Sequence, residues 1–157
     1  MSYKIITDSC CDFTDQMCEA MDISCVPLIV SYNGESHTNF SEEEAIKAFY
    51  NELRNGVTAT TSAVNPEGWA ELMKPVLAQG QDVLTICFSS GLSTTYQSAV
   101  IAAEELKEIY PDRKILVVDS LCAALGQGLL IWYACQKKAE GLSLASFLPS
   151  GELYYPD

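Results

Sequence analysis

Apolar runs alternate with segments of helical spacing along the chain. Residues 4–7, 25–32, 83–88 and 114–118 form strand-like runs, of which the last two (VLTICF and KILVV) are almost continuously apolar. Between the runs, apolar residues recur every three or four positions, as on one face of a helix. Nearly continuous apolar strands separated by helices are typical of a parallel sheet that is covered on both faces. The pattern predicts an α/β fold with a mainly parallel sheet and helices on both faces.

Local signals mark the turns and the helix ends. The Asn33-Gly34 pair predicts a turn after the second strand, and Ser41 with Glu44 has the spacing of a capping box. We expect five helices, near residues 12–21 with Asp12 or Thr14 as cap, 41–55, from Asn65-Pro66 onward, 94–110 and 123–139.

Polar clusters directly follow three of the predicted strands. They are Asp8-Ser9, Ser89–Thr95 and Asp119-Ser120. Parallel strands end at one sheet edge, where ligands of such folds bind, so these clusters should meet there. Thr60–Ser62 lies in a predicted loop that can join them. Asp8 and Asp119 are expected to cap the strand ends.

The segment Ser89–Gln97 is rich in hydroxyl groups and glycine at a strand-to-helix bend. The first amides of a helix are unpaired and lie at the positive end of its dipole, so they favour an anion, and hydroxyl groups add neutral donors. We expect the amides around Gly91–Thr94 to face such a ligand. A carboxylate or a phosphate is the first candidate.

Composition and charge narrow the class of protein. The chain has 157 residues, 48% of them hydrophobic, which is enough for one compact domain. Its 21 acidic and 9 basic residues give a formal net charge of -12, which argues against nucleic acid and anionic lipid surfaces as partners. An anionic ligand must then be held by local donors and by a second contribution such as apolar burial.

The cysteines and the lengths of the apolar runs indicate in which cellular compartment the protein resides. Seven cysteines without a CxxC pair, several of them inside apolar runs, suggest buried thiols in a reducing cytosol. No apolar run reaches the roughly 18 residues of a membrane span, and the first residues lack a secretion signal. We expect a cytoplasmic protein without an integral membrane segment. A single histidine, His37, and the lack of metal-ligand spacing predict no metal or other cofactor.

The sequence resembles the N-terminal domain of the DegV family of bacterial fatty-acid-binding proteins, because it contains five motifs in the same order. They are IITDSCCDF (5–13), VPLIVSYNGE (26–35), TTSAVNP (60–66), SSGLSTTYQSA (89–99) and VVDSLCAALGQGLL (117–130). The resemblance implies the α/β fold of that domain over residues 1–144 and an irregular tail over 145–157. It also implies that the usual C-terminal domain is absent, as in a shortened chain.

The resemblance further implies a ligand and a partner. In the family, a threonine and a serine that correspond here to Thr61 and Ser93 hold the carboxylate of a long-chain fatty acid, and Ser62, Gly91 and Thr94 lie beside them. Members carry the fatty acid to the separate ATP-using subunit of a fatty acid kinase, which phosphorylates the carboxylate. The implied role is a lipid-binding carrier and not an enzyme. Thr94 stands where the family usually has glycine.

Two other interpretations are open on the sequence alone. Ser93 in Gly91-Leu92-Ser93 is placed like the nucleophile of an acyl hydrolase, but Thr95 stands where the G-x-S-x-G motif has its second glycine. The only imidazole that could activate it is His37, in a loop. Alternatively, Thr61 and Ser93 are ordinary loop caps in a structural or interaction module.

An uncovered apolar face predicts self-association, because contiguous apolar patches are rare on monomeric proteins. We expect the contact near the carboxyl ends of the strands, with Trp132, Tyr133 or the tail Phe147–Tyr155 folded across it. A homodimer is the simplest closed arrangement.

Overall fold

A four-stranded parallel sheet forms the centre of the fold in the computed structural model, which describes residues 2–38 and 43–147. Its strand order is β2 (Ile23–Val26), β1 (Tyr3–Asp8), β6 (Asp82–Cys87) and β7 (Ile115–Asp119), and all neighbours run parallel. β6 is buried along its whole length, as a near-continuous apolar run requires. The predicted parallel sheet is confirmed.

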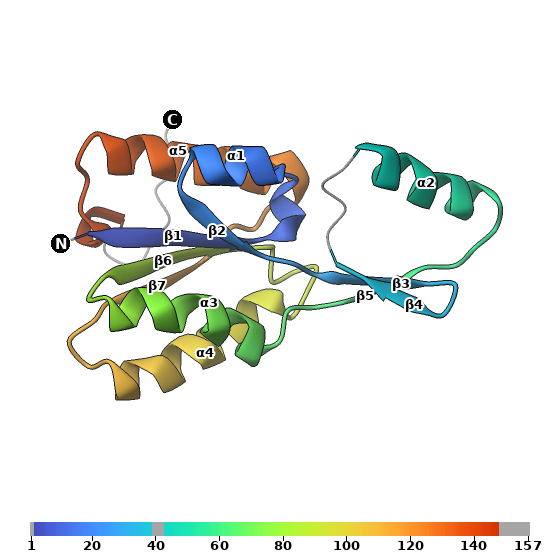
Figure 1. Cartoon of the computed structure of the whole chain (residues 1–157). Helices are drawn as coiled ribbons and strands as arrows, with labels where there is room; N and C mark the ends of the chain where they lie inside the picture. Colours follow the sequence, from blue (N-terminus) through green and yellow to red (C-terminus); the bar gives the residue numbers. More distant parts are fainter. Residues whose placement is uncertain (1, 39–42, 148–157) are drawn as a thin grey trace.

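Helices cover both faces of this sheet, also as predicted (Figure 1). α1 (Asp15–Ala20) and α5 (Ala124–Ala139) lie on one face, and α3 (Pro66–Ala78) and α4 (Thr95–Ile109) lie on the other. Each face therefore has its own hydrophobic core, one containing the fully buried Trp69 of α3 and the other the buried Ile131 of α5. The seven cysteines are free thiols, and two of them, Cys11 and Cys87, are fully buried.

The described chain ends in a 3₁₀ turn, Leu144–Phe147, that packs against the core under α5. The ring of Phe147 meets Tyr3 edge-on, with 6.0 Å between the ring centres. Tyr3 begins β1, at the amino edge of the sheet. The expectation that Phe147 folds across the carboxyl edge is therefore wrong, and the rest of that expected segment lies outside the described residues.

A second, three-stranded sheet corrects two expectations. The run 25–32, predicted as one strand, is divided at Pro27 between β2 and β3 (Ile29–Tyr32), because proline has no N–H for a sheet ladder. β3 pairs antiparallel with β4 (Glu35–His37) and with β5 (Thr60–Ser62). Thr60–Ser62 is thus a strand and not a loop, in keeping with the preference of β-branched threonine for extended backbone.

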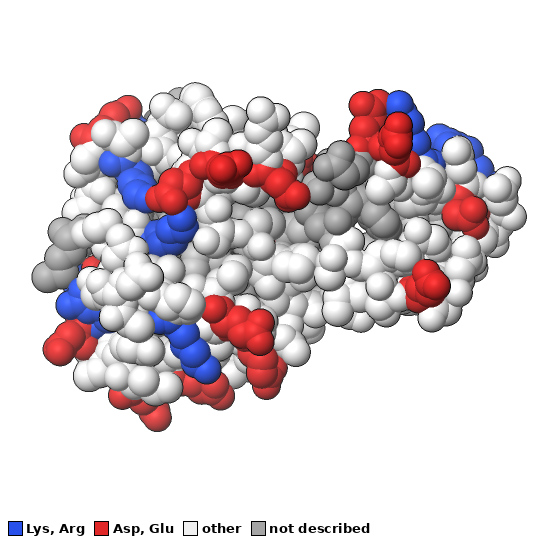
Figure 2. Space-filling view, viewed as in Figure 1, with Lys and Arg blue, Asp and Glu red and all other residues white. Residues whose placement is uncertain are grey.

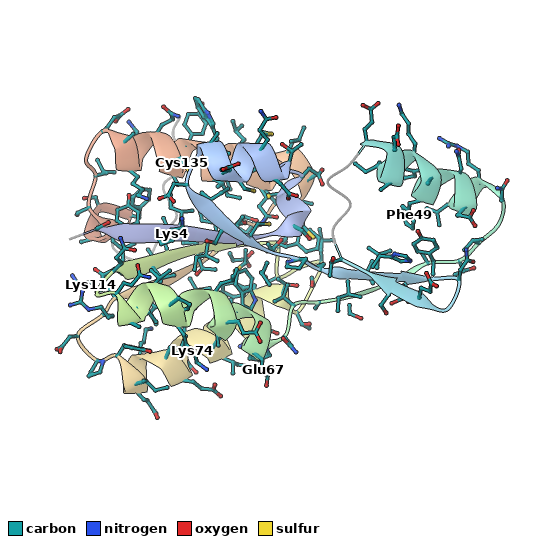
Figure 3. The ribbon with its side chains drawn as sticks, in the orientation of Figure 1. Lys4, Phe49, Glu67, Lys74, Lys114 and Cys135 are labelled. Carbon is teal, nitrogen blue, oxygen red and sulfur yellow. The ribbon has the colours of Figure 1, made fainter. Side chains whose placement is uncertain are left out.

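The helix α2 (Glu43–Arg54) accompanies this second sheet, which extends to one side of the main sheet (Figure 1). Phe49 points from α2 toward the sheet (Figure 3), and its ring centre lies 5.2 Å from that of Tyr32. The predicted turn at Asn33-Gly34 is confirmed, with φ values of 52° and 79° that suit a two-residue hairpin turn. The capping box expected at Ser41 lies outside the described residues.

Local capping fixes the ends of the helices on the main sheet. The Thr14 hydroxyl accepts a hydrogen bond from Met17 N at 3.2 Å where α1 begins, and the Asn65 side chain accepts one from Gly68 N at 2.9 Å where α3 begins. α3 ends at Ala78 and is followed by Gly80, whose φ of 78° allows the chain to turn away, and α5 is followed in the same manner by Gly141 with a φ of 90°. In the described residues, no helix combines the length and the apolar character needed to cross a bilayer.

Helix α5 lies against the 3₁₀ turn Ser9–Cys11 at a distance that excludes a side chain. A Cβ atom at Gly128 would lie 2.8 Å from the carbonyl oxygen of Cys11 and 2.9 Å from the ring of Phe13. Gly126, two positions earlier, has open surroundings, because its nearest heavy atom would be Cys122 Cβ at 3.5 Å. The close approach at Gly128 sets the distance between α5 and the end of β1.

Replacing Gly128 with alanine should lower the free energy of unfolding by about 1–3 kcal/mol, because the backbone of the turn must move. The matched variant Gly126→Ala should be neutral or stabilising by up to about 1 kcal/mol, since alanine has the higher helix propensity. Urea denaturation of both variants measures the difference. Equal stabilities would show that α5 can shift at no cost.

An apolar stripe on α5 faces solvent. Leu125, Leu129, Trp132 and Tyr133 are between 44% and 63% exposed, and their spacing of three, four or seven places them on neighbouring parts of one helix face. Ile109 at the end of α4 is similarly exposed, at 62%, but on the opposite side of the sheet. The stripe gives the expected self-association a specific location.

Sedimentation velocity at micromolar concentration should therefore show a species larger than the monomer. The double variant Leu125→Lys, Leu129→Lys should shift the sedimentation distribution toward the monomer, because self-association would bury two charged lysine side chains in the contact and remove their water. Ile109→Lys is the control and should leave the distribution unchanged. A wild-type chain that sediments as a monomer contradicts the prediction.

Candidate functional site

The carboxyl ends of the main-sheet strands lie at one edge. In the ladder, Thr7 of β1 is opposite Ile86 of β6, and Cys87 of β6 is opposite Asp119 of β7. The loops after β1, β6 and β7 therefore leave the sheet side by side. The three polar clusters meet at this edge, as the sequence predicts.

Asp8 joins the first two loops. Its Oδ2 accepts a hydrogen bond from Phe88 N at 2.7 Å, and its Oδ1 accepts from Cys10 N at 3.1 Å and from Gln127 Nε2 at 3.3 Å. The residue is fully buried, and this burial raises the pKa of Asp8, although the hydrogen bonds that it accepts lower the pKa in part. Asp8 thus has the structural role that the sequence predicts.

Asp119 joins the loops after β6 and β7. Its Oδ1 accepts hydrogen bonds from Ser90 N and from Leu121 N, both at 3.1 Å. Backbone bonds reinforce the contact, since Ser89 N donates to Cys122 O at 3.1 Å. The bend after β6 is therefore held from both sides, by the loop after β1 and by the loop after β7.

The bend itself is organised around Ser89. Gly91 N donates to the Ser89 hydroxyl at 3.2 Å, and Leu92 N and Ser93 N donate to its carbonyl oxygen at 3.0 and 3.1 Å. These three amides are satisfied within the bend, so the expectation that they face a ligand is wrong for them. Thr94 is the N-cap of α4 and makes no side-chain capping bond, but the first amide of the helix, Thr95 N, donates to Ser93 Oγ, so the amides of the first turn that have no acceptor among the described residues are those of Tyr96 and Gln97.

Ser93 lies half-buried at the start of α4. Its Oγ accepts a hydrogen bond from Thr95 N at 3.2 Å and lies 2.8 Å from Thr95 Oγ1. Gly91 and Thr94, on either side of it, are exposed. The structure thus brings three of the five predicted site residues together in one bend.

Thr61 and Ser62 lie on β5, where both are exposed. Thr61 is opposite Val30 of β3, so this pair of residues belongs to the second sheet. The chain then runs to Val64, whose N–H donates to Thr95 Oγ1 at 3.3 Å. Through this bond the segment that follows Thr61 is attached to the residue that contacts Ser93.

Two residues of this edge were not expected from the sequence. Thr95 is fully buried and connects Ser93 with Val64. Gln127 is also fully buried, and its Nε2 donates to Thr7 Oγ1 at 3.1 Å and to Asp8. The position of Gln127, four residues before Ile131 on the buried face of α5, is the sequence signal that could have identified it.

The surroundings of Ser93 differ from those of a hydrolase nucleophile. A serine nucleophile needs a base within hydrogen-bond reach. Among the described residues, the Ser93 hydroxyl has two hydrogen-bond partners, and both belong to Thr95. His37 is on β4, where its ring stacks on Tyr32 at 4.4 Å between ring centres.

Comparison with known proteins finds relatives across nearly the whole chain. The family model described as uncharacterised proteins of the DegV family matches residues 2–150. A DegV domain-containing protein of Clostridium perfringens is 44% identical over 143 residues, which are 90% of this chain and 49% of that protein. The chain spans about half the length of the curated relatives that it matches.

Solved structures share the fold. A stearic acid-binding protein from Eubacterium ventriosum superposes with a TM-score of 0.82 at 29% identity, over 92% of this chain and 50% of that one. A fatty-acid-binding DegV family protein from Thermus thermophilus gives a TM-score of 0.81 at 32% identity, over 93% and 50%. The Fak B3 protein of the Streptococcus pneumoniae fatty acid kinase, solved with linoleic acid, shares the fold at a TM-score of 0.76 and 22% identity, over 93% and 51%.

The buried Asp8 predicts a pH-dependent change in stability. Asp8→Asn should lower the free energy of unfolding by about 1–3 kcal/mol, because both carboxyl oxygens accept hydrogen bonds and the amide puts an NH2 group, which cannot accept, in place of one of them. The pKa of Asp8 is higher in the folded state than in the unfolded state, so the folded state binds the Asp8 proton more tightly. The stability that Asp8 contributes is therefore fully present below the unfolded-state pKa and decreases as the pH rises through the folded-state pKa.

Urea unfolding of wild type and Asp8→Asn between about pH 3.5 and 7 measures this effect, and other titrating groups cancel in the difference. The loss of stability in the variant should be largest near the unfolded pKa of about 4 and shrink as the pH rises. A loss that grows with pH would mean that the three donors outweigh the burial of the carboxylate.

Proposed function

The chain belongs to the DegV family, and we propose that it binds a long-chain fatty acid whose carboxylate contacts the hydroxyl groups of Thr61 and Ser93. One observation carries the proposal. The hydrogen bond from Val64 N to Thr95 Oγ1 attaches the segment after Thr61 to the bend that holds Ser93. This bond supports a site shared by the two hydroxyl groups, which come from different parts of the fold.

Neutral donors suit a carboxylate on this protein. The net charge of -12 repels anions at long range, and acidic side chains dominate the charged surface seen in Figure 2. The amides that follow Thr95 in the first turn of α4 and nearby hydroxyl groups act only at short range, where the positive end of the helix dipole adds to them. In the proposed site, Ser62, Gly91 and Thr94 line the same opening as Thr61 and Ser93.

The acyl chain would supply most of the binding free energy. Burial of about fourteen methylenes at ~0.8 kcal/mol each gives an upper limit of ~11 kcal/mol before the costs of association. A neutral hydrogen bond adds only about 0.5–1.5 kcal/mol. The hydroxyl groups would therefore orient the head group, while the apolar chain holds the ligand. This division supports a fatty acid over inorganic phosphate.

We also propose that the protein presents the carboxylate to the ATP-using subunit of a fatty acid kinase and performs no chemistry itself. Thr61, Gly91 and Thr94 are exposed, so a partner enzyme could reach a carboxylate held beside them. In the relatives of twice the length, the remaining half would enclose more of the acyl chain. The carrier role is thus proposed from relatives that are about twice as long as this chain.

The double variant Thr61→Ala, Ser93→Ala tests the head-group contacts. Its affinity for oleic acid should fall about tenfold relative to wild type, as expected for two neutral hydrogen bonds, whereas its affinity for oleyl alcohol should change less than about threefold. Displacement of a fluorescent fatty acid measures both. Thr60→Ala is the matched control, because alternate residues of β5 point to opposite faces.

Two outcomes would favour the other interpretations. Hydrolysis of a simple acyl ester by the pure protein, abolished by Ser93→Ala, would identify an acyl hydrolase. A wild-type chain that binds neither lipid, and that carries none in native mass spectrometry, would leave a structural or interaction module.

A further inference from the structure

We infer that Thr95 is a positioning residue that keeps the Ser93 hydroxyl proton directed toward a bound carboxylate. The inference rests on the proposed function and adds to it a residue that itself would not touch the ligand. Its basis is the set of hydrogen bonds around Thr95, a fully buried residue in the first turn of α4.

The polar groups of Thr95 are held on several sides. Its Oγ1 accepts a hydrogen bond from Val64 N at 3.3 Å and lies 2.8 Å from Ser93 Oγ. Its N–H donates to Ser93 Oγ at 3.2 Å, and its carbonyl oxygen accepts from Trp69 Nε1 at 3.1 Å. Trp69 is itself fully buried, so α3 fixes the first turn of α4 in place.

The direction of the bond between the two hydroxyl groups follows from counting protons. A hydroxyl group has one proton to donate and can accept two hydrogen bonds. If Ser93 donated to Thr95, then Thr95 Oγ1 would accept from Ser93 and from Val64, and its own buried proton would have no acceptor among the contacts of the described residues. An unmade hydrogen bond at a buried hydroxyl is costly, so Thr95 donates and Ser93 accepts.

This direction frees the proton of Ser93. Ser93 Oγ then accepts from both the N–H and the hydroxyl of Thr95, and its own proton has no acceptor among the residues that the structure describes. The chain of donors runs from Val64 through Thr95 to Ser93, and each bond in such a chain polarises the next. Ser93 is thereby prepared as a donor before a ligand arrives.

Thr95 also connects the two parts of the proposed site, the segment that follows Thr61 and the bend that contains Ser93. Val64 follows Thr61 by three residues, and Ser93 precedes Thr95 by two. The β-branched side chain of threonine has few rotamers, which suits a hydroxyl that must bond in two fixed directions. Loss of this one hydroxyl should therefore affect the ionised head group and leave the binding of the acyl chain intact.

Thr95→Val removes the hydroxyl at nearly constant volume and provides the test. In oleic acid labelled with ¹³C at the carboxyl carbon, the NMR shift reports the pKa of the bound acid. Affinity for the carboxylate should fall about fivefold in Thr95→Val, which corresponds to a rise of about 0.7 pH unit in the pKa of the bound acid. Affinity for oleyl alcohol should stay within about twofold, and Thr95→Ser, which keeps the hydroxyl, should restore the lower pKa.

Thr85→Val is the matched control. Thr85 is a fully buried threonine of β6 whose Oγ1 has no hydrogen-bond partner in the described structure, so its replacement should leave the pKa of the bound acid unchanged. Should Thr95→Val fail to fold, as judged by circular dichroism, Thr95→Cys keeps a weak donor and acceptor, and the bound acid should then titrate between the wild-type and Ser93→Ala values.

The outcomes separate the inference from the proposed function. If the wild type binds oleic acid and the bound acid titrates alike in wild type and Thr95→Val, or alike in wild type and Thr95→Cys, the role of Thr95 is refuted and the proposed function stands. If the wild type binds no oleic acid, the proposed function is refuted, and the inference with it.

Discussion

The buried carboxylate of Asp8 is the interaction on which the carboxyl edge of the main sheet depends. It accepts N–H groups from the 3₁₀ turn after β1, from the loop after β6 and from α5. A neutral side chain has too few acceptors to join these three segments, whereas a carboxylate can accept from all of them. The protein bears the cost of desolvating this charge, visible in the raised pKa of Asp8, and gains a fixed starting point for the bend that carries Ser93.

The bend then satisfies most of its own polar groups. Ser89 accepts the N–H groups of Gly91, Leu92 and Ser93, and Asp119 accepts that of Ser90. A loop organised in this way is rigid without a ligand, so it need not lose much conformational entropy on binding. What it leaves for a ligand is small: the hydroxyl groups of Ser90, Ser93 and Thr94 and the amides that follow Thr95 in the first turn of α4. In the proposed function, such a site would orient a carboxylate and would depend on apolar contacts for affinity.

The sequence predicts those elements correctly that are determined by residues close together in the chain. The near-continuous apolar run of β6 and the Asn33-Gly34 turn were both evident, because each follows from periodicity or from backbone preference within a few residues. β5 was not predicted as a strand because its three exposed residues show no apolar pattern. These residues form a strand through their pairing with β3, about thirty positions away in the chain. Thr95 was missed for a similar reason, since its importance lies in a bond to the distant Val64.

The proposed site therefore has two parts, one around Ser93 that is backed by well-packed elements and one around Thr61 that has little packing around it. Ser93 lies in the bend between β6 and α4, two elements that pack in the hydrophobic cores of the main sheet, whereas Thr61 belongs to a small sheet whose strands are half-buried or exposed. Besides the covalent connections, the bond between Val64 and Thr95 attaches that small sheet to the bend. A carboxylate bridging Thr61 and Ser93 would add a second attachment parallel to the first. Since a ligand stabilises the state it binds, the small sheet, whose strands contain no fully buried residue, would gain most from it.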